Sequence, residues 1–150
     1  NQANYINSQI FFLVMNKVIL SLLLAGIGTQ LIKIICIWVK TKQFSWKDFL
    51  VTGGMPSSHS AFVISLATIL FLQEGFSSTF AVSLVLAVIV IRDAFGVRRT
   101  AGEEGMVLIN IMKKLKMKQE THFSLGHTPL QVFVGSLIGF LVSIGVYYFI

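Results

Sequence analysis

Two histidines each lie at the start of an apolar stretch, among residue types that bind phosphate. The first, His59, ends the segment GGMPSSH, in which Pro56, Ser57 and Ser58 precede it. Glycines allow a ligand close to the backbone, proline stiffens the start of a helix, and a serine cap leaves N–H groups at the positive helix end, where anions bind. A serine-capped helix with an uninvolved histidine explains this segment equally well.

The second histidine, His127, lies in LGHTPLQVFVG, residues 125–135. Thr128 and Gln131 have the spacing of a capping box, and Pro129 has the first helical position. Two histidines at two helix N-termini suit phosphoryl transfer, one as nucleophile and the other as general acid. We therefore predict that His59 and His127 converge on one anion.

Two lysines are candidates to hold that anion. Lys33 lies within an apolar stretch, and Lys40 follows about two turns later on roughly the same helical face. Ionisable side chains inside a membrane segment are functional candidates by default. Snorkelling of either lysine to the membrane interface is the plainer alternative.

Further charges flank another apolar stretch. Arg92 and Asp93 lie inside it, and Arg98 and Arg99 lie at its end. A structural ion pair inside the bundle is the alternative for Arg92 and Asp93. The basic run 113–118 is better explained by contact with anionic lipid headgroups.

The composition indicates an integral membrane protein. Of 150 residues, 55% are hydrophobic and 12% charged, with a mean hydropathy of +0.80. A soluble domain carries about twice that share of charged residues. The net charge of +6 is concentrated in two loops, so it indicates membrane topology and not nucleic-acid binding. The single cysteine, Cys36, permits no internal disulfide.

The hydropathy pattern predicts an all-α membrane bundle of about four transmembrane helices in one domain, residues 1–150. A short interfacial or re-entrant segment precedes the first span, and residues 1–15 are peripheral, without the basic start of a signal peptide. Residues 98–126 form a basic, amphipathic cytoplasmic loop. The predicted spans are Val18–Val39, Ser58–Leu72, Thr79–Val97 and Pro129–Ile150.

The loops predict the orientation. The turn Gln73–Ser78 carries only Glu74, whereas the other two connections hold nearly all the cations. Cytoplasmic loops retain Lys and Arg, so we expect both termini outside and the histidines on the cytoplasmic face.

With these residues identified, the chain resembles the type-2 phosphatidic acid phosphatase/vanadium haloperoxidase superfamily, in its divergent bacterial and plastid branch. The resemblance runs from about Asn16 to the C-terminus and rests on GGMPSSHSA, DAFGVRR-AG and LGHTPLQVFVG. Lys33, six residues and Lys40 look like the motif K-x6-R-P, with lysine in place of arginine and no proline. Residues 56–59 look like P-S-G-H. The branch implies a bacterial cell membrane or, alternatively, a plastid membrane.

The resemblance implies a role for each matched residue. His59 would protonate the leaving alkoxide, and His127 would form a phosphohistidine. Lysines 33 and 40 and serines 57 and 58 would hold the phosphate, together with Arg98 or Arg99, because Thr121 stands where the family has an arginine.

The family's orienting acid falls at Gln131, which is not a carboxylate. In an analogous Asp–His pair, losing the acid costs about 10⁴ in rate when the tautomer is wrong. Asp93 could take that role if its helix passes behind His127.

The expected function is a metal-independent, cofactor-free membrane phosphatase acting on a lipid phosphate monoester or diphosphate. Phosphatidic acid, phosphatidylglycerol phosphate and isoprenyl phosphates share this headgroup chemistry. One alternative is a catalytically weakened protein that binds or translocates lipid phosphates, which Gln131 favours; another is a structural membrane subunit. Gly135 and Gly139 form G-x-x-x-G, which supports either a homodimer or packing within the chain.

Overall fold

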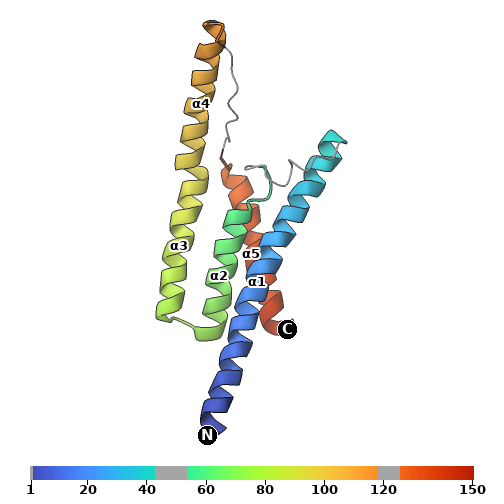
Figure 1. Ribbon diagram of the computed structural model, residues 1–150, viewed down its shortest axis with the longest axis vertical. Helices are drawn as coiled ribbons and strands as arrows, with labels where there is room; N and C mark the ends of the chain where they lie inside the picture. The colour runs from blue at the N-terminus through green and yellow to red at the C-terminus, as the bar shows by residue number, and fades with distance from the viewer. Residues whose placement is uncertain (1, 43–53, 118–125) are drawn as a thin grey trace.

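The computed structural model describes residues 2–42, 54–117 and 126–150, and their side chains from Asn16 onward except that of Lys40. All regular structure in these ranges is helical, which confirms the predicted all-α membrane bundle. The helices, coloured in chain order in Figure 1, are α1 (Gln2–Thr41), α2 (Ser58–Glu74), α3 (Ser78–Phe95), α4 (Val97–Lys114) and α5 (Pro129–Phe149).

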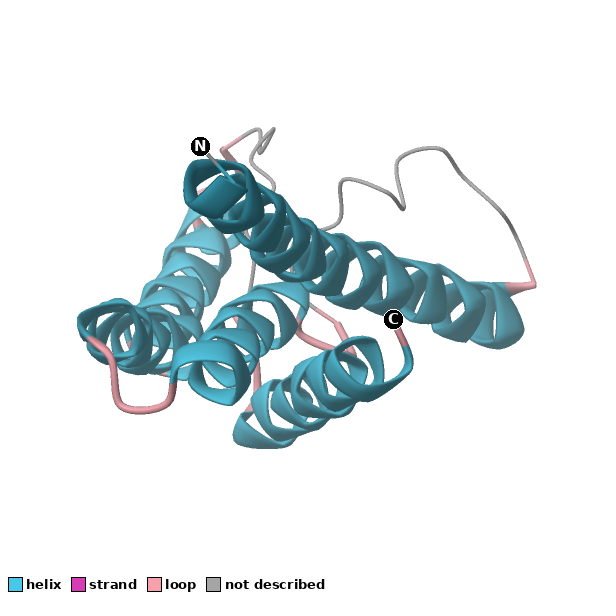
Figure 2. Ribbon diagram, turned by 90° about the horizontal axis from the view of Figure 1, so that it is seen from below, coloured by secondary structure: helices cyan, strands magenta, loops and turns pink. Residues whose placement is uncertain are grey.

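Helix α2 lies at the centre of the bundle. It packs against α1, α3 and α5, and α5 also contacts α1 and α3. Within the described residues, α1 and α3 do not contact each other. Both ribbon views show α1 inclined across the other helices (Figures 1 and 2). One side of α2, between α1 and α3, is therefore left uncovered by a helix.

In the part of the chain that the structure describes, three helical stretches are long and apolar enough to cross a membrane: Asn16–Val39, Ser78–Lys114 and Pro129–Phe149. Helix α2 is apolar but has only 17 residues. At 1.5 Å per residue it is about 25 Å long, somewhat less than the hydrocarbon core. The predicted span Ser58–Leu72 is thus a shorter apolar helix.

Of the two alternatives predicted for the segment before the first span, the re-entrant one is wrong, and the interfacial one stays a prediction. Helix α1 runs without a break from Gln2 to Thr41. No proline or glycine interrupts it before Gly26, so nothing forces the chain to turn near Asn16 and Lys17. The Lys17 ammonium donates to the Tyr147 carbonyl oxygen at 3.2 Å, which compensates this charge within the helix.

The predicted basic loop 98–126 is largely a helix. Helix α4 follows α3 after the single residue Gly96 and extends beyond the bundle (Figure 1). Its sequence lacks proline, and Arg99 pairs with Glu103 one turn later at 3.0 Å, a spacing that favours helix. Residues 118–125 of that loop lie outside the described residues.

The G-x-x-x-G motif packs inside the chain. A Cβ on Gly135 would lie 2.2 Å from the Ser57 carbonyl oxygen, and one on Gly139 would lie 2.2 Å from that of Ala61. The backbones of α5 and α2 therefore touch, as small residues permit in membrane bundles. Both glycines are buried, so this motif is not available for the predicted homodimer, which remains a prediction.

Three buried serine hydroxyls connect α1, α2 and α5 by hydrogen bonds. Ser21 of α1 lies 2.7 Å from Ser65 of α2 and 2.9 Å from Ser143 of α5, all fully buried. Each hydroxyl satisfies another where water is absent, so the cluster fixes the relative heights of the three helices.

Gly139→Ala tests this packing. The added methyl group would overlap the Ala61 carbonyl, and overpacking of this kind costs about 1–3 kcal/mol. We expect a lower Tm for the purified protein in detergent. Gly145→Ala on the same helix is the matched control, because nothing lies within 4 Å of its Cβ position, and it should keep or raise Tm. Equal Tm values for Gly139→Ala and wild type would contradict the close contact.

Candidate active site

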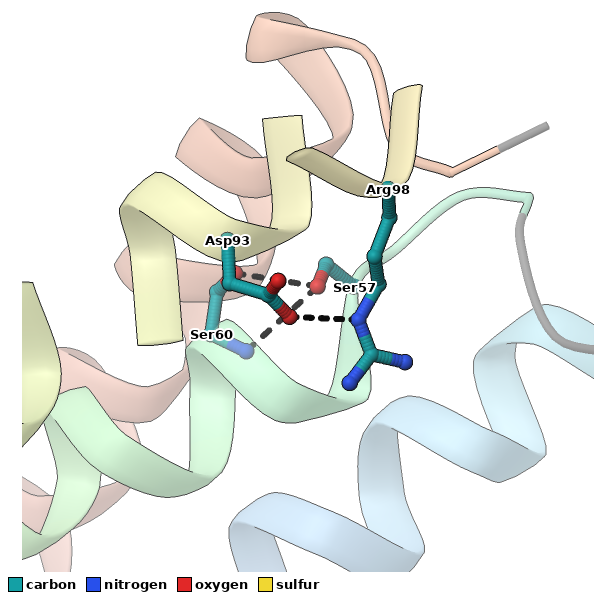
Figure 3. Close-up of polar contacts among 4 residues, drawn as sticks. All are labelled: Ser57, Ser60, Asp93 and Arg98. Carbon is teal, nitrogen blue, oxygen red and sulfur yellow. Dashed lines mark hydrogen bonds and ion pairs between the residues drawn. The ribbon is translucent and has the colours of Figure 1, made fainter. Parts of the chain in front are cut away.

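The start of α2 is held by Ser57. Its hydroxyl accepts from the Ser60 amide at 3.4 Å and the Ser60 hydroxyl at 2.9 Å (Figure 3). Its own amide donates to the Gln131 carbonyl oxygen at 3.1 Å. Ser57 is fully buried. Its side chain therefore serves as the helix cap and not as the predicted phosphate contact, which leaves the N–H groups of Ser58 and His59 at the helix end.

The start of α5 holds the second histidine. Thr128 and Gln131 form the predicted capping box: the Gln131 amide donates to the Thr128 hydroxyl at 3.3 Å, and the Thr128 amide donates to Gln131 Oε1 at 3.0 Å. The same Oε1 lies 3.3 Å from His127 Nδ1. A backbone N–H only donates, so the atom between Thr128 and His127 is the amide oxygen, and Nδ1 must carry the proton. His127 Nε2 is then an unprotonated lone-pair nitrogen.

The end of α3 joins these two helix starts. The His127 amide donates to the Ala94 carbonyl oxygen at 3.0 Å. Gly126 has φ +66°, and a Cβ there would lie 2.7 Å from the Arg99 amide nitrogen, so this turn lies directly on the α3–α4 junction. Only glycine combines that conformation with that approach.

An ion pair lies beside the first turn of α2. Arg98 Nε is 2.5 Å from Asp93 Oδ2, and both side chains remain partly exposed (Figure 3). Arg98, Lys33 and Asp93 are all close enough to His59 to interact with it electrostatically. Arg98 is thus the arginine at this site, whereas the Arg99 side chain pairs with Glu103.

Burial and charge set the protonation state of His127, which precedes the membrane-spanning part of α5. The side chain is only 5% exposed. Burial lowers its pKa below 6.5, and the charges of Lys33 and His59 act in the same direction. Hydrogen bonds with Gln131 and with the Gly54 backbone raise the pKa without reversing the shift. His127 is therefore neutral at pH 7, the form in which Nε2 can attack an electrophile.

The structure brings most of the predicted residues together. Lys33, 4% exposed, acts on His127 and His59, so one cation and both histidines share a site. Asp93 does not lie behind His127 as the sequence allowed, because its carboxylate faces Arg98 and Gln131 is the group that contacts the imidazole. The side chain of Lys40 lies outside the described residues, and its role stays a prediction.

Sequence reasoning missed Gln30. Its Oε1 accepts from the Ser58 hydroxyl at 3.0 Å, which ties α1 to the start of α2. Gln30 precedes Lys33 by one helical turn within an apolar span, and a polar residue at that spacing was a usable signal. The Gly54 backbone, which contacts His127, left no such signal in the sequence.

Comparisons with known proteins agree with the motifs. Residues 14–142 match the Divergent PAP2 family. The chain is 39% identical over 155 residues to the "Uncharacterized membrane protein YuiD" of Bacillus subtilis (strain 168), covering 91% of this chain and 98% of that protein. No solved structure matches this chain.

The titration of His127 tests the electrostatics. We expect its ring protons, followed by NMR and assigned by their loss in His127→Ala, to titrate below pH 6.5 because burial disfavours the charged ring. Lys33→Met removes a neighbouring positive charge and should raise the pKa of His127. A His127 pKa at or above 6.5 in wild type, or no response to Lys33→Met, would contradict this arrangement.

Proposed function

The chain belongs to the Divergent PAP2 family, and on that premise we propose that it is a metal-independent lipid phosphatase working through a phosphohistidine on His127. The observation that carries the proposal is the hydrogen bond from His127 Nδ1 to Gln131, which leaves Nε2 unprotonated on a buried, neutral ring that interacts electrostatically with His59 and Lys33. A histidine that served only packing would need no second histidine and no buried cation beside it.

Substrate phosphate would bind at the start of α2. Lys33 and Arg98 supply positive charge, and the N–H groups of Ser58 and His59 supply donors at the positive helix end. Such fixed donors act strongly in a water-poor site, and their effect grows as negative charge builds on the transferring phosphoryl group. The Ser58 hydroxyl, held by Gln30, lies beside them.

The reaction then takes two steps. His127 Nε2 attacks phosphorus, the bond from phosphorus to the lipid oxygen breaks, and His59 gives its proton to that oxygen. In the second step, water attacks the phosphohistidine and His59 takes the water proton. Inorganic phosphate leaves, and both histidines return to their starting states.

Gln131 sets the limit of this chemistry. Its amide oxygen fixes the tautomer and orientation of His127, which a carboxylate does elsewhere in the superfamily. A neutral oxygen stabilises the positive ring of a phosphohistidine less than an anion would. We therefore expect slow turnover.

The same observation supports a second candidate, a protein that binds or translocates lipid phosphates without efficient hydrolysis. Its phosphate contacts would be identical, and only the chemical step would fail. Activity measurements separate the two candidates.

We propose that the site lies on the cytoplasmic face of a bacterial cell membrane. Both histidine-bearing helix starts lie at the same end of the bundle as the ends of α1 and α3, where α4 carries its basic residues (Figure 1). Cytoplasmic segments retain such cations.

Among the described residues, no three His, Cys, Asp or Glu side chains gather as metal ligands. The proposed steps use no metal ion.

Loss of the nucleophile tests the proposal. We expect purified protein in detergent with EDTA to release phosphate from at least one lipid phosphate in a panel, and His127→Ala to release none above background. Phe133→Ala, which removes an exposed side chain from the same helix, is the control and should stay active. Unchanged release in His127→Ala would refute the mechanism.

Gln131→Glu tests the limit set by the amide. Glutamate at this position keeps the capping box, so the fold should be preserved. We expect kcat to rise about tenfold or more, because the carboxylate stabilises the charged ring. Phosphate release at several pH values gives the rate. An unchanged or lower kcat at every pH would show that Gln131 does not limit turnover.

A further inference from the structure

The uncovered side of α2 carries His59 and a row of apolar side chains. Phe62, Leu66 and Leu70 follow His59 at helical spacings of three and four residues, so all four share one face of α2. Helices α1 and α3 flank this face without contacting each other in the described residues. The face is therefore the floor of a groove that α1 and α3 line beside His59 and that α3 lines farther along α2.

Two cavities lie along this groove. One of about 260 Å³ is lined by Ser58 and His59 at its polar end and by Gly26, Phe62, Val63 and Val90. The other, of about 350 Å³, has Leu66 and Leu70 on one side and Val82 and Leu86 on the other.

The two cavities are collinear. Phe62, Leu66 and Leu70 succeed one another along α2, while Val90, Leu86 and Val82 succeed one another in the opposite direction along α3. Among the described residues, His59 is the only titratable side chain that lines either cavity. A ligand that extends from His59 along both cavities must therefore be apolar beyond its head.

The groove has a defined length. From His59 to Leu70 it runs about 16 Å along α2, roughly half of a 30 Å hydrocarbon core and hence the depth of one leaflet. Its far end lies at the α2–α3 turn, where the rings of Phe71, Phe76 and Phe80 pack with centroids 5.1–5.9 Å apart. Ser78 and Thr79 line that end.

We propose that this groove binds one acyl chain of a lipid phosphate, which enters sideways from the bilayer between α1 and α3. The proposal rests on the proposed function in one respect, because the proposed function is what puts the lipid phosphate at His59 and His127. The acyl chain of a bilayer lipid matches the groove in length, whereas a much longer polyprenyl chain would extend past the α2–α3 turn.

Photo-crosslinking tests the groove without requiring turnover. The probe is phosphatidic acid with a diazirine near the end of one acyl chain, added to the His127→Ala protein in detergent so that it is not hydrolysed. Phosphatidylcholine with the same acyl chain is the matched control. We expect phosphatidic acid to label peptides containing Leu66–Leu70 and Val82–Leu86, and unlabelled phosphatidic acid to compete.

Labelling confined to the exposed face of α5 around Leu137 and Phe140, or equal groove labelling by both lipids, would overturn the proposal. The outcome is separable from that of the phosphatase assay. Groove labelling of His127→Ala, together with no phosphate release by the wild-type protein, would support the groove and reject the phosphatase activity. Phosphate release by the wild-type protein without groove labelling of His127→Ala would support the activity and reject the groove.

Chain-length selectivity gives a second, independent test in the active protein. Leu66→Trp fills the middle of the groove, whereas Leu137→Trp adds the same ring to the exposed face of α5. We expect Leu66→Trp to lower kcat/KM for a long-chain phosphatidic acid about tenfold relative to a dihexanoyl one, the loss expected when roughly two methylene groups leave the groove. An equal loss for both substrates, or the same selectivity change in Leu137→Trp, would contradict the assignment.

Discussion

The site depends on the contact between the backbones of α5 and α2. Gly135 and Gly139 have no side chains, so α5 approaches until the Ser57 amide donates to the Gln131 carbonyl oxygen at 3.1 Å. That contact places two helix N-termini side by side, close enough for His59 and His127 to interact electrostatically. In a membrane, where no water satisfies stray backbone groups, such a contact is also a stable way to close the bundle.

The side chain of Gln131 has two structural roles. Its amide oxygen caps α5 through Thr128 and orients His127 at the same time. The burial that keeps His127 neutral also keeps the Lys33 charge unscreened, so the cation acts at close range on whatever anion binds between the histidines. The groove along α2 adds the apolar half of the same site, since it begins at His59.

Features encoded by neighbouring residues could be predicted from the sequence. The capping box at Thr128, the helix cap at Ser57 and the membrane spans follow from local spacing and hydropathy. Features that depend on distant packing could not. Whether Asp93 faced His127 or Arg98 depended on how α3 continues into α4, and the continuity of α1 through Lys17 depended on a carbonyl partner far along the chain.

The central claim is that His127 carries the phosphoryl group, and mapping that group tests it most directly. Protein mixed with phosphatidic acid, quenched in alkali to preserve phosphohistidine and analysed by mass spectrometry, should carry one phosphoryl group on the peptide that contains His127. The signal should vanish in His127→Ala. Phosphate release with no modified His127 at any time, or with the phosphoryl group on another residue, would contradict the account.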